Sequence, residues 1–180
     1  MSILKKYLFA LVFFMPAGRL FALDTLKICS PSGNICVKVW MDGLLKYQID
    51  YGDKTILEPS GIDLVLKNGI RLSDNKSIRS HRLSGESEQI ISPVPEKRRI
   101  IQNDYSRLVL KFRNPFRVEF RVYDDAVAYR ISTQFRDSII IKNELAEFRF
   151  PGRPSAWFAE MHKRQDADIF HTSFEELYPH

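Results

Sequence analysis

The sequence predicts an all-β fold, an antiparallel β-sandwich. Short runs in which apolar and polar residues alternate recur along the chain, with turn-forming residues between them. No convincing amphipathic helix is found before residue 150. Short antiparallel strands at regular spacing, with no helices to cover a parallel sheet, are typical of a sandwich.

The best-specified element is a hairpin over residues 117–133. If Asp124 and Asp125 form a two-residue loop, three apolar pairs lie on one side: Val122–Val127, Phe120–Tyr129 and Val118–Ile131. On the other side Glu119 falls opposite Arg130. A slip of one residue would bring Glu119 and Arg121 into the core, so the alternation determines the register. A three-residue loop would need Ala126 in a left-handed conformation, which is unfavourable for a residue with a Cβ.

A second hairpin is predicted over residues 26–40, with its turn at residues 30–34. Its alternation puts Cys29 and Cys36 on the same outer face, and pairing of Ser30 with Ile35 would set them directly opposite each other. Two cysteines so placed in an exported chain indicate a disulfide, contributing about 2–3 kcal/mol. Two free thiols are the alternative, and a metal site is a poor one because no histidine is near.

The remaining strands are predicted with less detail. Pro59-Ser60-Gly61 is expected to break the chain, Asn68-Gly69 to form a tight hairpin turn, and residues 73–104 to hold one or two short strands between loops. After Pro151 the chain has neither strand nor helix periodicity, apart from a capping box that begins at Ser173. The other expected strands cover residues 44–51, 55–57, 62–67, 70–72, 105–112, 138–142 and 144–150.

Residues 1–22 have the layout of a signal peptide. Lys5 and Lys6 precede an apolar run that is too short to span a bilayer, and Ala22 is the expected cleavage point. The mature protein is therefore expected in the periplasm or secreted, with no membrane association after cleavage. Without Lys5, Lys6 and Arg19 it carries 24 Lys and Arg against 22 Asp and Glu, a formal charge of +2. So small an excess argues against a nucleic-acid partner.

No self-sufficient catalytic motif is present. The histidines lack metal-protease spacing, and no serine lies in a nucleophile elbow. His162 with Asp166 or Asp168 could hold a metal, although solvated loop residues are the simpler reading. Trp40 and Trp157 are candidate platforms for stacking against a sugar, and edge packing is the alternative role.

Several segments together resemble the amino-terminal domain of glycoside hydrolase family 97, a family of periplasmic or secreted α-glucosidases and α-galactosidases. They run in order along most of the mature chain. Ala126 departs from the family pattern, which has a glycine after the Asp-Asp turn. The matching segments are SPSGNICVKV, YGDKTILEPSGIDLVL, PVPEKRRIIQNDYSRLVLKF, FRVYDDAVAYRI, FRFPGRPSAWF and FEELY.

The resemblance implies a super-sandwich similar to galactose mutarotase over residues 23–151, here expected to be incomplete, followed by an irregular segment over residues 152–180. It also implies a carbohydrate partner (an α-glucoside or α-galactoside), a catalytic (β/α)8 barrel beyond this chain, and calcium as cofactor. Glu175 matches the family's calcium-ligating glutamate, with Phe174 in place of its aromatic hydroxyl. Because the catalytic residues lie on the barrel, the chain is expected to be inactive alone. A free-standing carbohydrate-binding module and a structural sandwich domain are the alternatives.

Overall fold

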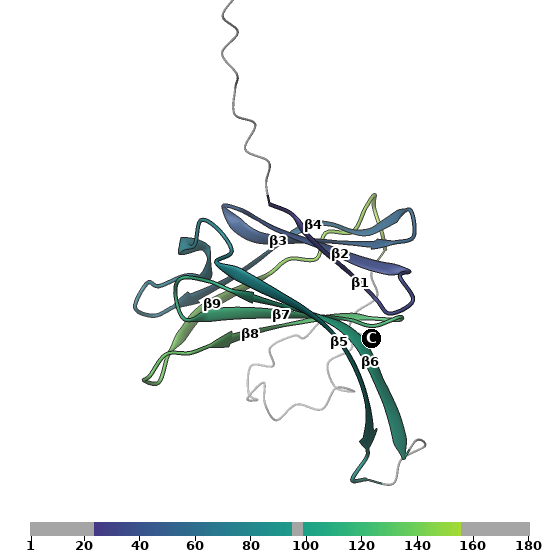
Figure 1. Cartoon of the computed structure of the whole chain (residues 1–180). Coiled ribbons are helices and arrows are strands. Elements are labelled where there is room, and N and C mark those ends of the chain that lie inside the picture. The colour runs from purple at the N-terminus through teal and green to yellow at the C-terminus, as the bar shows by residue number, and fades with distance from the viewer. Residues whose placement is uncertain (1–23, 95–98, 156–180) are drawn as a thin grey trace, which may run out of the picture.

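The computed structural model describes residues 24–94 and 99–155, which form two antiparallel sheets facing each other (Figure 1). The first sheet has the order β1-β2-β3-β4-β9 and the second β5-β6-β7-β8. The prediction of an all-β antiparallel sandwich is confirmed. The strands are β1 (Leu26–Cys29), β2 (Ile35–Asp42), β3 (Leu44–Tyr51), β4 (Lys54–Leu66), β5 (Ser80–Ile91), β6 (Ile100–Lys111), β7 (Phe116–Val122), β8 (Val127–Thr133) and β9 (Ile141–Ala146), with one short 3-10 helix, η1 (Leu72–Asp74).

The core lies between the two sheets and is built from the alternating residues of their strands. Tyr47 of the first sheet contacts Phe120 and Tyr129 of the second, with ring centroids 5.9 and 5.8 Å apart. Such tilted aromatic pairs add to the free energy gained by burying their area. The residues that are fully removed from solvent come from both sheets and include Val37, Val39, Leu45, Ile62, Leu108, Leu110, Val118, Phe120 and Val122.

The hairpin over residues 117–133 forms with the predicted register. Phe120 pairs with Tyr129 and Glu119 with Arg130. The loop has two residues, because the backbone N–H of Tyr123 donates to the carbonyl of Ala126 at 2.8 Å. No residue other than glycine has a positive φ in the described part of the chain, so Ala126 is not left-handed.

Two of the predicted breaks are wrong. The expected break at residues 59–61 is absent, and β4 runs unbroken from Lys54 to Leu66 with register shifts against β3. Glu58 and Pro59 have no partner residue in β3, so the missing N–H of Pro59 leaves no hydrogen bond between β3 and β4 unmade. The two strands expected over residues 138–150 are the single strand β9, followed by an isolated bridge between Glu58 and Arg149.

Residues 70–104 also differ from the prediction. Instead of a strand at residues 70–72, the Asn68-Gly69 turn leads into η1. Instead of one or two short strands, residues 80–91 form one long strand, β5, which pairs without interruption with β6 from Ser80–Lys111 to Ile91–Ile100. β5 and the first three residues of β6 are largely exposed on both faces, so their residues need not alternate between apolar and polar and carry no period-two signal.

Candidate functional site

The outer face of the four-stranded sheet carries a carboxylate surrounded by arginines. Glu119 of β7 is only 8% exposed in its side chain and accepts hydrogen bonds from Arg107 Nη2 and Arg121 Nε, both at 2.8 Å. Arg130 of β8 lies farther off, at 3.5 Å. The guanidinium of Arg121 also lies over the ring of Tyr105, 4.6 Å from its centroid. Strands β6, β7 and β8 are therefore tied together by one charge cluster.

This cluster fixes the ionisation of Glu119. Burial raises the pKa of the Glu119 carboxyl, but the hydrogen bonds from Arg107 and Arg121 outweigh it and leave the pKa below its ordinary value. A general acid needs the opposite shift, which keeps the proton on the carboxyl near neutral pH. The arrangement thus holds a carboxylate that stays charged at neutral pH and positions guanidinium groups. It is suited to joining strands and not to proton transfer.

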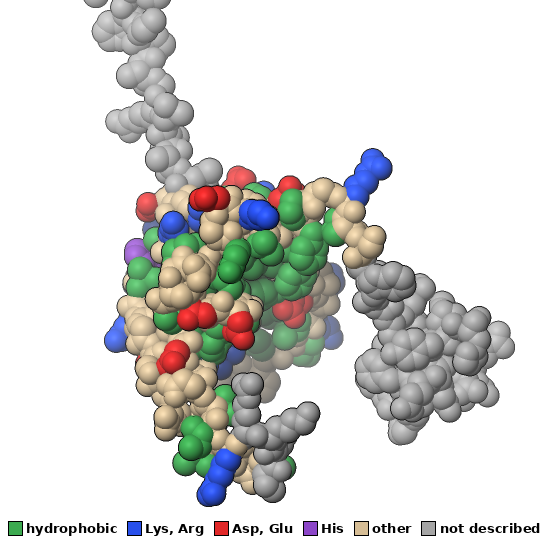
Figure 2. Space-filling model, turned by 90° about the vertical axis from the view of Figure 1, so that its right-hand side faces the viewer, with side chains coloured by type: hydrophobic (Ala, Val, Ile, Leu, Met, Phe, Trp, Pro, Cys, Tyr) green, Lys and Arg blue, Asp and Glu red, His purple; other side chains and the backbone are tan. Residues whose placement is uncertain are grey.

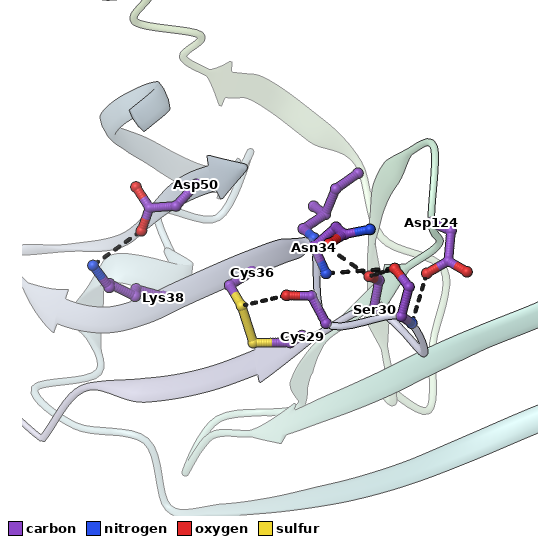
Figure 3. Close-up of a disulfide and its surroundings, with 10 residues drawn as sticks. Cys29, Ser30, Asn34, Cys36, Lys38, Asp50 and Asp124 are labelled. Carbon is purple, nitrogen blue, oxygen red and sulfur yellow. Dashed lines mark hydrogen bonds and ion pairs between the residues drawn. A yellow bond between two sulfur atoms is a disulfide. The ribbon is translucent and has the colours of Figure 1, made fainter. Parts of the chain in front are cut away.

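The end of the sandwich where the hairpin turns meet is held by a second set of polar contacts (Figure 3). Cys29 and Cys36 pair directly across β1 and β2 and are joined by a disulfide with an S–S distance of 2.01 Å. In the adjoining turn, the backbone N–H of Ser32 donates to Asp124 Oδ1 at 2.9 Å. Hydrogen bonds from Ser32 lower the pKa of Asp124, which therefore stays ionised. This contact links the first turn of one sheet to the β7–β8 turn of the other.

Beside these turns lies an apolar groove of about 370 Å³. Figure 2 shows hydrophobic side chains gathered on this side of the molecule, with acidic side chains next to them. Tyr51 and Ile56 remain 53% and 45% exposed there. No motif in the sequence indicates the groove, because its walls come from segments far apart in the chain: Ile35, Ile49, Tyr51, Ile56, Asp124, Asp125, Ala126 and Val127.

Trp40 lies on the outer face of the five-stranded sheet. Its neighbours in β2, Val39 and Met41, are buried in the core, while Trp40 itself is half-buried and pairs with Lys46 of β3. On the same face Lys38 Nζ lies 2.9 Å from Asp50 Oδ2. The indole is therefore accessible and flanked by charged groups, an arrangement compatible with either edge packing or a ligand contact.

The other predicted site residues lie outside the described residues. These are Trp157, the candidate sugar platform, and Glu175, the candidate calcium ligand, together with His162, Asp166 and Asp168. Within residues 24–94 and 99–155, no group of three or more His, Cys, Asp or Glu side chains could hold a metal ion. The same part of the chain contains no helix with the length and apolarity of a membrane span.

Comparison with known proteins gives one consistent family. A protein-family model described as Glycosyl-hydrolase 97 N-terminal matches residues 28–180. A retaining α-galactosidase from Bacteroides thetaiotaomicron is 29% identical over 178 residues, which cover 97% of this chain and 27% of that protein.

Solved structures show the same fold. An enzyme of glycoside hydrolase family 97 from Pseudoalteromonas sp. strain K8, in complex with panose, matches with a TM-score of 0.63 at 21% identity, over 70% of this chain and 20% of that one. A β-arabinopyranosidase matches with a TM-score of 0.60 at 21% identity, over 70% of this chain and 21% of that one. The chain thus spans 27% of the curated relative and about a fifth of these structures.

Proposed function

The chain belongs to the glycosyl-hydrolase 97 N-terminal family, and we propose that it serves as the amino-terminal sandwich of an exported α-glycosidase whose catalytic part lies outside this chain. The observation that carries the proposal is the family match over residues 28–180 in a chain that spans 27% of a retaining α-galactosidase. In this role the sandwich is a scaffold and a wall on the substrate side of the catalytic part. The substrate class is an α-glucoside or α-galactoside.

The electrostatics of the described residues support this division of labour. Glycoside hydrolysis uses two carboxyl groups, one of which acts as an acid and needs a raised pKa. Every carboxyl group with a shifted pKa in the described part of the chain has it lowered, so each of them stays ionised at neutral pH. These groups are Asp50, Asp104, Glu119, Asp124 and Glu147.

We propose Glu175 as the one calcium ligand that this chain contributes. Calcium takes six to eight oxygen ligands, so a single carboxylate of this chain would hold the ion only together with oxygens from the catalytic part. The chain by itself is therefore expected to bind calcium no more tightly than about millimolar. In a complete enzyme, Glu175→Gln should weaken the calcium dependence of activity. The neighbouring Glu176→Gln is the matched control and should leave that dependence unchanged.

Activity and export test the proposal directly. Residues 23–180 would be fused to the rest of the Bacteroides thetaiotaomicron α-galactosidase in place of its matching segment. We expect the fusion to hydrolyse an aryl α-galactoside and the chain alone to show no turnover above buffer. Turnover by the pure 180-residue chain would overturn the proposal. Amino-terminal sequencing of the exported protein should start at Leu23.

A free-standing carbohydrate-binding module is the second candidate, supported by the accessible indole of Trp40 on the outer face of β2. The two functions differ in what the chain does alone. A module would bind α-glucans or α-galactosides by itself and lose that binding in Trp40→Ala, which calorimetric titration of the isolated chain would detect. A domain that only completes an enzyme would show no such binding.

A further inference from the structure

A basic pocket lies where β6 turns into β7, at the opposite end of β7 from the Asp124–Asp125 turn. It has a volume of about 520 Å³ and a mostly polar lining. Four cationic side chains line it, and no acidic residue of the described chain does: the cations are Arg79, Lys111, Arg113 and Arg117. A concave surface with charge of a single sign attracts ions of the opposite charge.

The four cations have no partners that balance them. None of their side chains makes an ion pair or a hydrogen bond with the described part of the chain. Even the buried Nε of Arg117 has no hydrogen-bond acceptor there. Lys111 lies directly opposite Arg117 in the pairing of β6 with β7, and like charges at such positions destabilise a sheet. The arrangement therefore lowers the stability of the unliganded chain.

The backbone around the pocket is held rigidly. Asn75, which is only 7% exposed, donates from Nδ2 to Asn114 Oδ1 at 2.7 Å and accepts at Oδ1 from the backbone N–H of Arg113 at 3.1 Å. On the side of β5, the backbone N–H of Arg79 donates to the carbonyl of Lys111 at 2.9 Å. The segments that carry these three cations are thus fixed relative to one another before a ligand arrives, which reduces the entropy lost on binding.

The lining indicates the class of ligand. Ser80 and Gln134 also line the pocket, and their side chains make no hydrogen bond with the described residues, so they can bind hydroxyl groups. Phe112 and Phe116 are only 4% and 1% exposed. The pocket therefore offers no aromatic face on which a nucleic-acid base would stack and, apart from Pro115, no apolar contact for a peptide or lipid anchor.

We propose that this pocket binds an oligosaccharide that carries carboxylate or sulfate groups. Guanidinium groups bind such anions through paired N–H donors, and four cations around one pocket match a ligand with several anionic groups. The hydroxyl groups of the sugar would bind Ser80 and Gln134. This ligand differs in charge from the α-glucoside or α-galactoside of the proposed function, and its binding here involves no hydrolysis, so the inference goes beyond that function.

Calorimetric titration of the purified chain tests the proposal with three probes. A heparin hexasaccharide carries sulfate and carboxylate groups, hexagalacturonate carries carboxylates alone, and maltohexaose is neutral. We expect one or both acidic probes to bind more tightly than maltohexaose by about tenfold or more, and this binding to weaken as the salt concentration rises.

Two double variants locate the binding. Lys111→Gln with Arg113→Gln removes two exposed cations of the pocket and should weaken binding of the acidic probe by about tenfold or more. It also relieves the repulsion between Lys111 and Arg117, so the urea midpoint should stay the same or rise. Lys27→Gln with Lys54→Gln is the matched control. It removes two exposed cations of the first sheet and should change binding by less than about twofold.

The outcomes decide between this site and its alternatives. Equal losses in the two double variants would overturn the site, because net charge alone would then explain the binding. Equal binding of all three probes, or of none, would overturn it as well. Vesicles of equal parts phosphatidylcholine and phosphatidylglycerol are the last probe. If they bind the chain through Lys111 and Arg113 while the acidic sugars do not, an anionic lipid surface replaces the oligosaccharide. None of these results depends on the activity of the fusion, so their failure leaves the proposed function standing.

Discussion

At Glu119 three arginines converge on one carboxylate, and the sequence identified only the most distant of them. Alternation in the hairpin gave the cross-strand neighbour Arg130, whose guanidinium lies 3.5 Å away. The closer contact from Arg107 comes from β6, whose register against β7 no turn of the sequence defines. Cross-strand pairs within one hairpin follow from periodicity, whereas contacts between strands joined by an irregular connection require the tertiary structure.

Glu119→Gln should destabilise the chain by about 1–3 kcal/mol, because it removes the charge that neutralises partly buried guanidinium groups. Glu86→Gln is the control. Its carboxylate is 41% exposed and lies 3.8 Å from Arg107, so its loss should change the stability by less than about 0.5 kcal/mol. Urea unfolding at neutral pH measures both. Equal effects of the two substitutions would mean that the cluster has no special role.

The destabilisation caused by Glu119→Gln should depend on pH, and the lowered pKa of Glu119 determines the direction. Because the folded-state pKa of Glu119 is lowered, its stabilisation is complete above the unfolded-state pKa, about 4.3, and is lost as the pH falls through the folded-state value. The stability difference between wild type and Glu119→Gln should therefore be constant near neutral pH and shrink below about pH 4. A difference that grows on acidification would contradict this account.

The stability that Tyr47 contributes should depend on pH in the alkaline range. Its hydroxyl donates to the carbonyl of Glu147 at 2.8 Å, and burial raises its pKa to about 12. Tyr47→Phe should cost about 0.5–1.5 kcal/mol through the lost hydrogen bond. The wild-type stabilisation is complete below the unfolded-state pKa of about 10 and is lost as the pH rises toward the folded-state value. Unfolding measured across this range should show the wild type converging on the variant.

At the scale of elements, the junction of β4 with the segment after β9 depends on one glycine. The backbone N–H of Gly61 donates to Glu147 Oε2 at 2.8 Å, and a Cβ on Gly61 would lie 3.0 Å from that same oxygen and from Leu44 Cδ1. A methyl group on Gly61 would push the Glu147 carboxylate and Leu44 aside by a few tenths of an ångström. We expect Gly61→Ala to weaken the hydrogen bond to Glu147 and to destabilise the chain by about 0.5–1.5 kcal/mol.

Gly85→Ala is the matched control for this junction. Gly85 also lies in a strand, but no atom is within 4 Å of the position of its missing Cβ. The substitution should be neutral, or stabilise the chain by less than about 1 kcal/mol through the reduced entropy of the unfolded state. Thermal unfolding compares the two variants. If both substitutions changed the stability equally, the contact between Gly61 and Glu147 would make no specific contribution to the free energy of unfolding.

Alternation of apolar and polar residues predicted the strands that have one face in the core and one in solvent. The strands β1, β2, β3, β7 and β8 each have one face in the core, so their alternation predicted both their existence and the pairing of Cys29 with Cys36. By contrast, β5 and the first three residues of β6 are largely exposed on both faces and gave no such signal, whereas the half-buried stretch of β6 from residue 105 onward was predicted. The groove beside Tyr51 could not be predicted either, because it is formed by turns of both sheets that meet only in the folded chain.

At the scale of the whole molecule, the two sheets end in strands that have no further partner among the described residues. These edge strands are β1 and β9 in the five-stranded sheet and β5 and β8 in the four-stranded sheet. Large apolar side chains lie in and next to β9: Ile140 is 61% exposed, Ile141 55%, Phe148 59% and Phe150 54%. Unpaired backbone beside exposed apolar residues favours pairing between edges of separate molecules.

We therefore expect the isolated chain to self-associate at micromolar concentration through this region. Phe148→Ser with Phe150→Ser should shift sedimentation velocity profiles toward monomer, because it removes apolar area next to the edge of β9 while leaving the core intact. Leu83→Thr, which removes a similarly exposed residue from β5, should leave the profiles unchanged. Self-association should also disappear in the fusion with the rest of the α-galactosidase, if that part covers the same region. A monomeric chain with a sharp, reversible unfolding transition at this concentration would show that the edge at β9 is already adequately protected.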